Sequence, residues 1–510
     1  MNVCLRVDSS FSIGSGHIMR CLSLAKSLNK LGAQCTFISK GHSGNIIEKI
    51  GQGGFDFKVI AAPVHSNDYV IDEKSWLGGN QSDDAQDFIS LINKEIKKPD
   101  IIIVDHYSLD EEWERIVKQY FPTTRLVVID DLCNRKHRCD LLIDQTYKRQ
   151  ADEYSLLTEN NCKVLTGTQY ALINPSFQKL RKQSINKKSL LNKPQTLMIT
   201  MGGVDAQDVT GKILDYLELA DFTNFTKITV ILGIACPHAT KIRFQAQKSK
   251  YNIDVLSNVT NMAELMLEHD CSIGALGGTT WERCSMAQPA VNIAIANNQR
   301  TIAQNLLNEG AIVLDANTFS QAELCSAIES LIMNYQEQRI LAMNICDGLG
   351  IMRDVQEIIP QPAKDGHNVT LRLATEDDID FVYQLQCEPQ TRRFARNPEI
   401  PEYVNHVSWM KDRLSNAESV FYIIDHDGAC GVLRLDPVQH ISATHEISIF
   451  LTTKSHGKGV ATAAIKRALM LHTDFSVLAT VLPENHTSHK LFNSIGFKKI
   501  SSSEYISEKE

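Results

Sequence analysis

The sequence predicts an α/β protein with two doubly wound domains that are followed by a smaller α+β domain. Its 510 residues suit about three domains of ordinary size. Up to residue 359, short apolar runs alternate with amphipathic helical patterns, which is typical of parallel sheets covered by helices. After residue 366 the strand-like runs are typical of an antiparallel meander instead.

The composition narrows the class of protein. Hydrophobic residues make up 43% and charged residues 22%, as in globular domains, and the net charge of −8 gives no support to nucleic-acid or membrane binding. The 13 cysteines are scattered, which favours reduced thiols and a cytoplasmic location. No signal peptide and no apolar run long enough to span a membrane is present. Cys133, His137 and Cys139 lack a fourth ligand, so we predict no metal site.

We place the first domain at residues 1–180. Its predicted strands are Val3–Val7, 35–38, 101–104 and 126–129, and a helix begins at Gly16. The last two strands are continuous apolar runs that end in Asp105 and in Asp130 and Asp131. Such runs are typical of strands buried on both faces, and ligands of open α/β sheets bind at the carboxyl edge that these acids mark.

A polar, lysine-rich stretch at 183–195 is predicted to separate this domain from a second one at 190–358. The second domain repeats the pattern, with strands at 196–200, 228–232, 271–273 and 291–294. A second linker at 360–366 leads to the third domain at 367–510, with strands at 370–373, 420–424 and 445–451.

The turn after the first strand contains Gly14 and Gly16, followed by His17. The third glycine and the distant acid of a dinucleotide fingerprint are missing, and no Gly-Lys-Ser/Thr ending is present for a Walker loop. What remains is a turn that presents His17 at a helix N-terminus, either as a catalytic group or as a simple helix cap.

Two turns of the second domain carry paired glycines. Gly202 and Gly203 follow its first strand, and a later strand is followed by Gly277, Gly278, Thr279 and Thr280. Backbone N–H groups at such strand-to-helix turns attract phosphate. Glu282, one turn into the helix, is suited to accept two hydrogen bonds from a ribose diol. We therefore predict a nucleoside diphosphate site.

These motifs resemble those of the UDP-sugar hydrolase of pseudaminic acid biosynthesis, a relative of two-Rossmann glycosyltransferases of the glycosyltransferase-B type. The resemblance covers the first 355 residues and rests on Arg6–Ser10, Ile13–Leu22, Ile129–Asp131, Gly202–Asp205, Gly277–Glu282, Asn298–Gln299 and Asp347–Gly350. It implies hydrolysis of UDP-2,4-diacetamido-2,4,6-trideoxy-β-L-altrose at the anomeric carbon, with His17 as the catalytic base.

The residues suit that chemistry. UDP leaves readily once oriented dipoles hold its charge, so no metal is required, whereas water needs a base such as His17. Asp8 is expected to orient His17 or to bind sugar, with capping of the turn as the alternative. Asn298 and Gln299 are expected to bind the sugar, with ordinary turn chemistry as the alternative. Tyr107 is a further candidate to line the site.

The third domain has a second glycine turn before a helix, formed by His456, Gly457, Lys458, Gly459, Val460 and Ala461, and then Asn485. The order resembles the acyl-CoA core of the GNAT acetyltransferase superfamily, over about 368–505, and implies that these residues bind acetyl-CoA. Two residues depart from the family pattern: His456 replaces the usual Gln or Arg, and Phe492 replaces a tyrosine proposed to protonate the thiolate. Glu446 is a candidate base, or alternatively a solvent-exposed carboxylate.

Together the resemblances predict a bifunctional enzyme that acetylates the 4-amino group of a UDP-sugar and then hydrolyses the product. Its partners would be the UDP-sugar and acetyl-CoA, and the sequence leaves the oligomeric state open. Two alternatives remain: a UDP-sugar glycosyltransferase, and a hydrolase whose third domain only senses acetyl-CoA.

Overall fold

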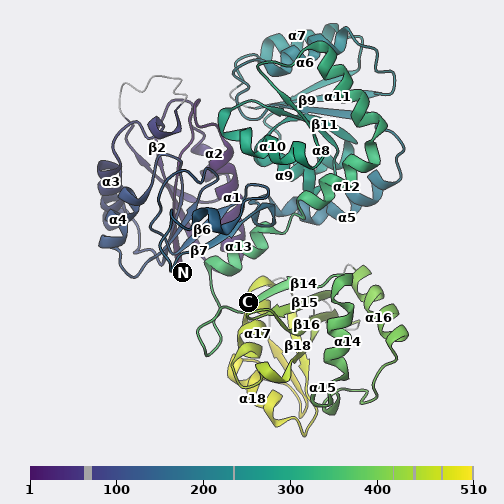
Figure 1. The fold of residues 1–510 in the computed structure, drawn as a ribbon. Coiled ribbons are helices and arrows are strands. Elements are labelled where there is room, and N and C mark those ends of the chain that lie inside the picture. The colour runs from purple at the N-terminus through teal and green to yellow at the C-terminus, as the bar shows by residue number, and fades with distance from the viewer. Residues whose placement is uncertain (63–71, 234–235, 417–418, 440–443, 473–474, 508–510) are drawn as a thin grey trace. The chain divides into compact units, whose positions relative to one another are not determined.

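The computed structural model describes residues 1–62, 72–233, 236–416, 419–439, 444–472 and 475–507 (Figure 1). The chain divides into two compact units: the first holds residues 1–29 and 33–354, and the second holds residues 30–32 and 355–510. The predicted fold class is confirmed: two Rossmann-like domains make up the first unit, and an α+β domain makes up the second.

The first Rossmann-like domain has a seven-stranded parallel sheet in the order β3-β2-β1-β4-β5-β6-β7. Its strands are β1 (Asn2–Val7), β2 (Gln34–Lys40), β3 (Asp56–Ile60), β4 (Ile101–Asp105), β5 (Arg125–Ile129), β6 (Leu141–Asp144) and β7 (Lys163–Thr166). Its helices are α1 (Gly16–Lys30), α2 (Glu48–Gln52), α3 (Gln81–Glu95) and α4 (Glu111–Tyr120). Every residue of β4 is buried, as its continuous apolar run predicts.

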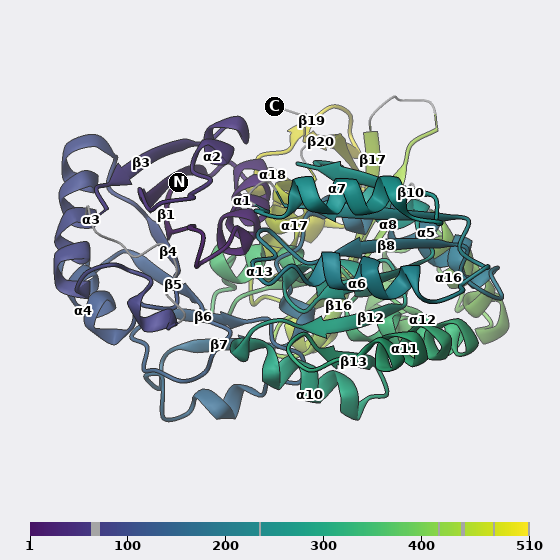
Figure 2. The same ribbon diagram turned by 90° about the horizontal axis from the view of Figure 1, so that it is seen from above.

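The second Rossmann-like domain has a six-stranded parallel sheet in the order β10-β9-β8-β11-β12-β13. The strands are β8 (Thr196–Thr200), β9 (Lys227–Leu232), β10 (Ile253–Ser257), β11 (Cys271–Ala275), β12 (Ala290–Ala294) and β13 (Ile312–Asp315). Its helices are α6 (Val209–Glu218), α7 (Ala239–Lys248), α8 (Met262–Glu268), α9 (Gly278–Ser285), α10 (Arg300–Asn308), α11 (Gln321–Met333) and α12 (Tyr335–Ile345). Figure 2 shows α6, α7, α8, α10, α11 and α12 beside the sheet. Alternate residues of β8 pack into two different apolar cores, so both faces of the sheet are covered.

The predicted linker at 183–195 is helical over its first half, which corrects that expectation. Helix α5 (Pro175–Ser189) is capped by Asn174, whose side chain accepts from the Ser176 N–H at 2.9 Å. Lys188 is buried and donates to the Met266 carbonyl at 2.8 Å, and burial lowers its pKa to about 7. The lysine-rich composition hides this buried anchor, because a lysine can bury its stem and satisfy its amine locally.

In both parallel sheets the strand order reverses between the first and the fourth strand, at β1/β4 and at β8/β11. Ligands of doubly wound sheets bind at such a reversal, at the carboxyl ends of the strands. The turns at 14–17, 202–203 and 277–280 follow β1, β8 and β11, so all three lie at these positions.

The second unit contains a seven-stranded mixed sheet in the order β14-β15-β16-β17-β18-β20-β19. Its strands are β14 (Thr370–Leu373), β15 (Val420–Asp425), β16 (Ala429–Pro437), β17 (Thr444–Leu451), β18 (Ser476–Thr480), β19 (Lys498–Lys499) and β20 (Glu504–Ser507). Its helices are α14 (Ile379–Cys387), α15 (Pro389–Arg393), α16 (Tyr403–Ser415), α17 (Val460–Leu471) and α18 (His486–Ile495). Among the strand pairs that the structure describes in this unit, only β17 and β18 are parallel. Their pairing stops at Glu446 and Leu478, while β17 continues to Leu451.

The segment that was predicted as the second linker packs onto this unit. Helix α13 (Gly350–Ile358) precedes it, and the Gln356 side chain exchanges hydrogen bonds with the backbone of Leu371 at 2.7 and 2.9 Å. Arg467 is buried and donates to the carbonyls of Gln356 and Ile359. Ala363 lies in the apolar core of the unit. The segment is therefore an ordered part of the domain that it precedes.

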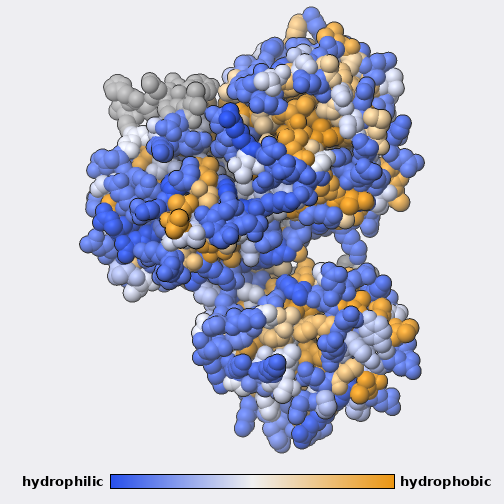
Figure 3. All heavy atoms as spheres, viewed as in Figure 1, coloured by the Kyte–Doolittle hydropathy of each residue, from blue (hydrophilic) through white to orange (hydrophobic). Residues whose placement is uncertain are grey.

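Hydrophilic side chains cover much of the surface drawn in Figure 3, with hydrophobic areas between them. None of the helices within the described ranges is both long enough and apolar enough to cross a membrane.

Candidate active sites

His17 lies in the first turn of α1, as predicted, and its side chain is largely buried. Its Nδ1 atom lies 2.6 Å from Oδ1 of Asp105, the last residue of β4. No protein group within the described ranges bonds to Nε2. A carboxylate at Nδ1 places the ring proton there and leaves Nε2 with its lone pair. The geometry therefore suits His17 to accept a proton at Nε2.

Near this pair lie three residues that are not among the predicted site residues: Arg20, Trp76 and Asp131. Arg20 donates to both oxygens of Asp105, at 2.7 and 2.6 Å, and also pairs with Asp131. Trp76 contacts His17 edge-on with ring centres 6.3 Å apart. The sequence signal was available for Arg20, because residues three apart on a helix lie on one face. Asp105 and Asp131 were noted only as strand-end acids.

Tyr107, predicted to line the site, does contact His17. Their rings meet edge to face with centres 4.6 Å apart. The Tyr107 hydroxyl donates to Asp131 at 2.9 Å, and Tyr107 also stacks on Trp76. The His17 ring is thus contacted by the aromatic rings of Trp76 and Tyr107 and by the Asp105 carboxylate.

Asp105 remains ionised in this setting. Burial alone would raise the pKa of Asp105, but the neighbouring Arg20 and His17 lower it more, so the pKa lies below its ordinary range. An ionised carboxylate stabilises a histidine that gains a proton during a reaction, which is what a general base requires.

The expected role of Asp8 as the partner of His17 is wrong. The Asp8 carboxylate is fully buried and pairs with Arg6, with His106 Nε2 3.2 Å away and the Lys40 N–H donating at 2.7 Å. Arg6 in turn donates to Asp84 at 2.8 and 3.0 Å. Asp8 therefore belongs to a buried ion-pair network at the end of β1. The carboxylate that pairs with His17 is that of Asp105 instead.

The glycine turns leave open space beside the backbone. Apart from its chain neighbours and the backbone of its own helix, a Cβ atom built at Gly14, Gly16, Gly202, Gly277 or Gly278 would have no atom of the described residues within 4 Å. Gly203 differs, because a Cβ there would lie 2.6 Å from the Ser15 hydroxyl oxygen. The turn after β8 therefore meets the turn before His17. This contact brings the predicted phosphate-binding turn of one sheet to the histidine of the other.

Glu282 lies in α9, one turn after Gly278. Burial of its carboxyl group raises the pKa of Glu282 to about 7, and the positive charge of Arg283 offsets this only in part. The predicted ribose contact requires an ionised carboxylate at Glu282. With this pKa, the charge of Glu282 changes near neutral pH, so the predicted hydrogen bonds to a ribose diol would depend on pH.

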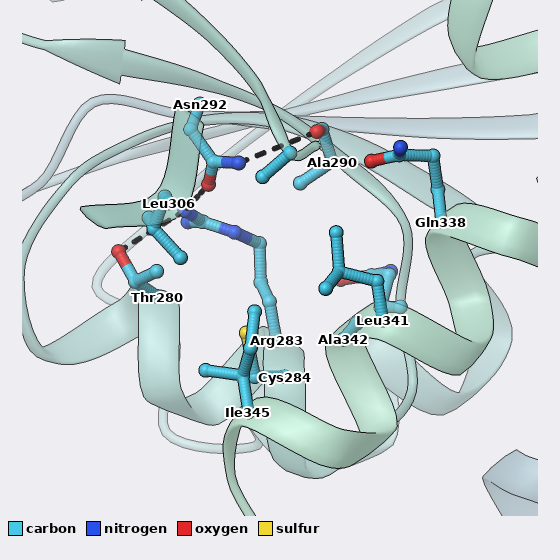
Figure 4. Close-up of a pocket in the computed structure, with 12 residues that line it drawn as sticks. Thr280, Arg283, Cys284, Ala290, Asn292, Leu306, Gln338, Leu341, Ala342 and Ile345 are labelled. Carbon is cyan, nitrogen blue, oxygen red and sulfur yellow. Dashed lines mark hydrogen bonds between the residues drawn. The ribbon is translucent and has the colours of Figure 1, made fainter. Parts of the chain in front are cut away.

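Thr279 and Thr280 both accept hydrogen bonds from the buried Arg283, and Figure 4 shows the contact with Thr280. Arg283 lines a pocket and donates to Asn292 Oδ1 at 3.0 Å, to the Thr280 hydroxyl at 3.3 Å and to the Thr279 hydroxyl at 3.4 Å. The Thr280 hydroxyl accepts from the Gly277 N–H at 3.0 Å. Burial lowers the pKa of Arg283 to about 10. Arg283 thus holds the turn from behind, and Thr280 is occupied within the protein.

Asn298 and Gln299 follow β12 and have different roles. The Gln299 side chain accepts from the Ile295 N–H at 2.8 Å and donates to the Leu276 carbonyl, so it fastens the loop beside Gly277. This is the alternative of ordinary turn chemistry. Oδ1 of Asn298 is buried and has no hydrogen-bond partner within the described residues, so Asn298 retains an acceptor for a ligand.

In the second unit, the predicted pyrophosphate turn has the required backbone. Gly457 and Gly459 have φ values of 75° and 85°, which favour glycine, and α17 begins at Val460. Within the described ranges, no acceptor binds the backbone N–H groups from Gly457 to Ala461. Successive N–H donors at a helix start are the groups that bind anions in other proteins, as the prediction for this turn requires.

The flanks of this turn were only partly predicted. Nε2 of His456 lies 3.2 Å from the Leu451 carbonyl, so its ring joins the turn to the end of β17. Lys364, which sequence reasoning missed, donates its N–H to the Lys458 carbonyl at 2.8 Å and its amine to the Gly457 carbonyl at 3.1 Å. Lys364 therefore adds a positive charge beside the free N–H groups.

The other predicted residues of this unit have protein partners. Asn485 caps α18 by accepting from the Ser488 N–H at 3.1 Å. Phe492 is buried against Phe497 and Tyr505. Glu446 lies where β17 and β18 separate, and it accepts from the Thr480 hydroxyl at 2.6 Å and pairs with Arg396. The candidate base Glu446 thus lies where β17 and β18 separate, and its carboxylate is paired with Arg396.

The chain thus combines two Rossmann-like domains, which have glycine turns at the carboxyl ends of their strands, with a separate α+β domain that has a glycine turn before a helix. Comparison with known proteins agrees. Residues 368–498 match the family model of the acetyltransferase (GNAT) domain. The UDP-2,4-diacetamido-2,4,6-trideoxy-beta-L-altropyranose hydrolase of Campylobacter jejuni is 27% identical over 61% of this chain and 97% of its own length. The chain is therefore a homologue of this UDP-sugar hydrolase in its N-terminal part, fused to a GNAT acetyltransferase domain.

Two further similarities extend the comparison. An uncharacterized protein of Methanocaldococcus jannaschii is 23% identical over 98% of this chain and 97% of its own length. The crystal structure of Acinetobacter baumannii MurG covers 70% of this chain and 99% of that one, with 13% identity and a TM-score of 0.48.

Proposed function

We propose that the first unit hydrolyses UDP-2,4-diacetamido-2,4,6-trideoxy-β-L-altropyranose to UDP and the free sugar, in the biosynthesis of pseudaminic acid. The observation that carries this proposal is the His17–Asp105 pair, because His17 follows the turn in which Ser15 meets Gly203 of the second glycine turn. The similarity to the Campylobacter jejuni hydrolase supports the choice of substrate.

In the proposed reaction, His17 takes a proton from water at Nε2 while the water oxygen attacks the anomeric carbon. The bond from that carbon to the diphosphate oxygen breaks, and UDP leaves with the electron pair. Asp105 stabilises the protonated His17, because its carboxylate is ionised and lies next to the ring. The N–H groups at the starts of α1 and α9 stabilise the charge that develops on the diphosphate. Glu282 binds the ribose, and Asn298 contacts the sugar.

The second unit is proposed to transfer an acetyl group from acetyl-CoA to the 4-amino group of the UDP-amino-sugar. Glu446 takes a proton from the amine, the amine nitrogen attacks the thioester carbonyl, and the carbon–sulfur bond breaks. Phe492 has no proton to donate, so CoA leaves as the thiolate. The N–H groups from Gly457 to Ala461 hold its pyrophosphate.

The two reactions are consecutive, because acetylation of the 4-amino group yields the diacetamido sugar that the first unit hydrolyses. We place the protein in the cytoplasm, in keeping with its 13 free cysteines.

The test is to incubate the full chain with the UDP-diacetamido-sugar and no acceptor. Stoichiometric release of UDP and free sugar is expected, and His17→Asn should abolish it while UDP binding and thermal unfolding stay near wild type. Release of UDP only when a sugar or lipid acceptor is added would establish a glycosyltransferase instead. A His17→Asn variant with near-normal turnover would remove His17 as the base.

The acetyltransferase is tested separately with the UDP-4-amino-sugar and acetyl-CoA. Acetylated UDP-sugar, detected by mass spectrometry, is the expected product. Binding of acetyl-CoA without acetyl transfer to this amine, together with a change in the rate of UDP release, would show that the domain is a sensor, the alternative that Phe492 favours.

A further inference from the structure

An ion pair covers the candidate base of the acetyltransferase domain. Arg396, in the segment between α15 and α16, donates from Nη2 to Oε1 of Glu446. The Arg396 side chain is 70% exposed, whereas that of Glu446 is 24% exposed. The pair therefore lies at the surface, where Arg396 is free to exchange Glu446 for another anion.

The same face of the sheet carries more positive charge. Asp436 lies directly across from Glu446 in the β16–β17 pair, so both side chains point to one face. The Asp436 carboxylate is already taken by Arg434 at 2.5 Å and by Arg413 at 3.2 Å. Three guanidinium groups thus share two carboxylates around the point where β17 and β18 separate.

This arrangement opposes one class of acceptor and favours another. The Arg396 guanidinium and the Thr480 hydroxyl both donate to Oε1 of Glu446, so this oxygen is engaged within the protein and is not available to the proton of an amine. A cationic amine such as a polyamine would meet an excess of positive charge here. An acceptor that carries a phosphate or diphosphate offers Arg396 a better partner, since guanidinium groups bind phosphate with two parallel hydrogen bonds.

We propose that the acetyl acceptor is an anionic amine and that Arg396 selects it by moving from Glu446 to the phosphate group of the acceptor. The move releases Glu446 to take the proton of the amine, which couples recognition of the acceptor to the availability of the base. This inference deepens the proposed acetyl transfer and rests on it.

The experiment compares three amines with the full chain and acetyl-CoA: the UDP-4-amino-sugar, the same amino-sugar without UDP, and spermidine. Loss of a charge-assisted hydrogen bond corresponds to on the order of tenfold or more in kcat/KM. Wild type should therefore prefer the UDP-linked amine over the free amino-sugar by at least about tenfold in kcat/KM. The free amino-sugar should show a lower kcat as well as a higher KM, because it leaves Glu446 paired with Arg396. Arg396→Gln should lose most of that preference, and Arg396→Lys should keep part of it.

The matched control is Arg138→Gln, which removes an exposed arginine from its pair with Glu159, 3.1 Å away, in the first unit. It should leave the preference unchanged. Equal acetylation of the UDP-linked and free amino-sugars by wild type, or an unchanged preference in Arg396→Gln, would overturn the inference while leaving acetyl transfer in place. Acetylation of none of the amines would refute the acetyl transfer itself and the inference with it.

Discussion

Replacing Asp105 with Asn tests whether the carboxylate beside His17 contributes to catalysis. The substitution keeps the shape but removes the charge 2.6 Å from His17 Nδ1. A hydrogen bond to a charged group contributes about 1.5–3 kcal/mol. Since each 1.4 kcal/mol is tenfold in rate, kcat for UDP release should fall by about 10- to 100-fold. KM should change little, because Asp105 is buried behind His17.

Asp105→Asn also costs stability, since Arg20 loses one of its two carboxylates, and this effect needs its own control. Asp130→Asn serves that purpose: Asp130 is buried at the next strand end and pairs with Arg135 at 2.6 Å. Both variants should unfold at lower temperature, but Asp130→Asn should keep its turnover once the folded fraction is accounted for. Steady-state UDP release by Asp105→Asn at the wild-type rate would refute the reasoning.

Three further predictions concern the ligand sites. Because the pKa of Glu282 is about 7, its ionised fraction rises about tenfold from pH 6 to pH 8. The UDP affinity of wild type, measured by calorimetry, should therefore rise by up to tenfold more over this range than the UDP affinity of Glu282→Gln. The same pH dependence in wild type and in Glu282→Gln would contradict a role of Glu282 in ribose binding. Lys364→Met should weaken acetyl-CoA binding about fivefold, the value of a pair worth ~1 kcal/mol, whereas the exposed Lys411→Met should not. Gly233→Ala should lower the free energy of unfolding by about 1–3 kcal/mol and weaken UDP binding, because the added Cβ would clash with the Gly203 carbonyl. Unchanged UDP affinity would show that the turn of Gly202 and Gly203 does not bind the nucleotide.

Much of the fold was predictable because parallel strands buried on both faces leave a strong pattern. The continuous apolar run of β4 and the acid at its end marked both the strand and its functional edge. The stretch at 183–195 misled because polarity was taken as absence of structure, whereas Asn174 and Pro175 start a helix that continues to Ser189. Composition also hid the packing of residues 356–369, which depends on partners such as Arg467, about 100 residues away in sequence.

The site was predicted where local chemistry decides it and missed where distant strands meet. His17 at a helix start and Gly457 in a turn before a helix are local features, and the structure has them as expected. The prediction that Asp8 orients His17 was wrong, because the sequence does not show which side chain lies next to an acid at the end of a strand. Only the order of strands shows that Asp105, from the neighbouring strand β4, faces His17 while Asp8 faces Arg6. The raised pKa of Glu282 likewise depends on burial that the sequence does not show.

The most direct test of the central claim is to follow the oxygen of the attacking water. The UDP-diacetamido-sugar is hydrolysed in water enriched in oxygen-18, and the products are analysed by mass spectrometry. If water activated by His17 attacks the anomeric carbon, UDP is released without an acceptor and carries no heavy oxygen. Heavy oxygen in UDP would show attack at phosphorus, and absence of UDP release would show that this chain is not a hydrolase; either result would contradict the account.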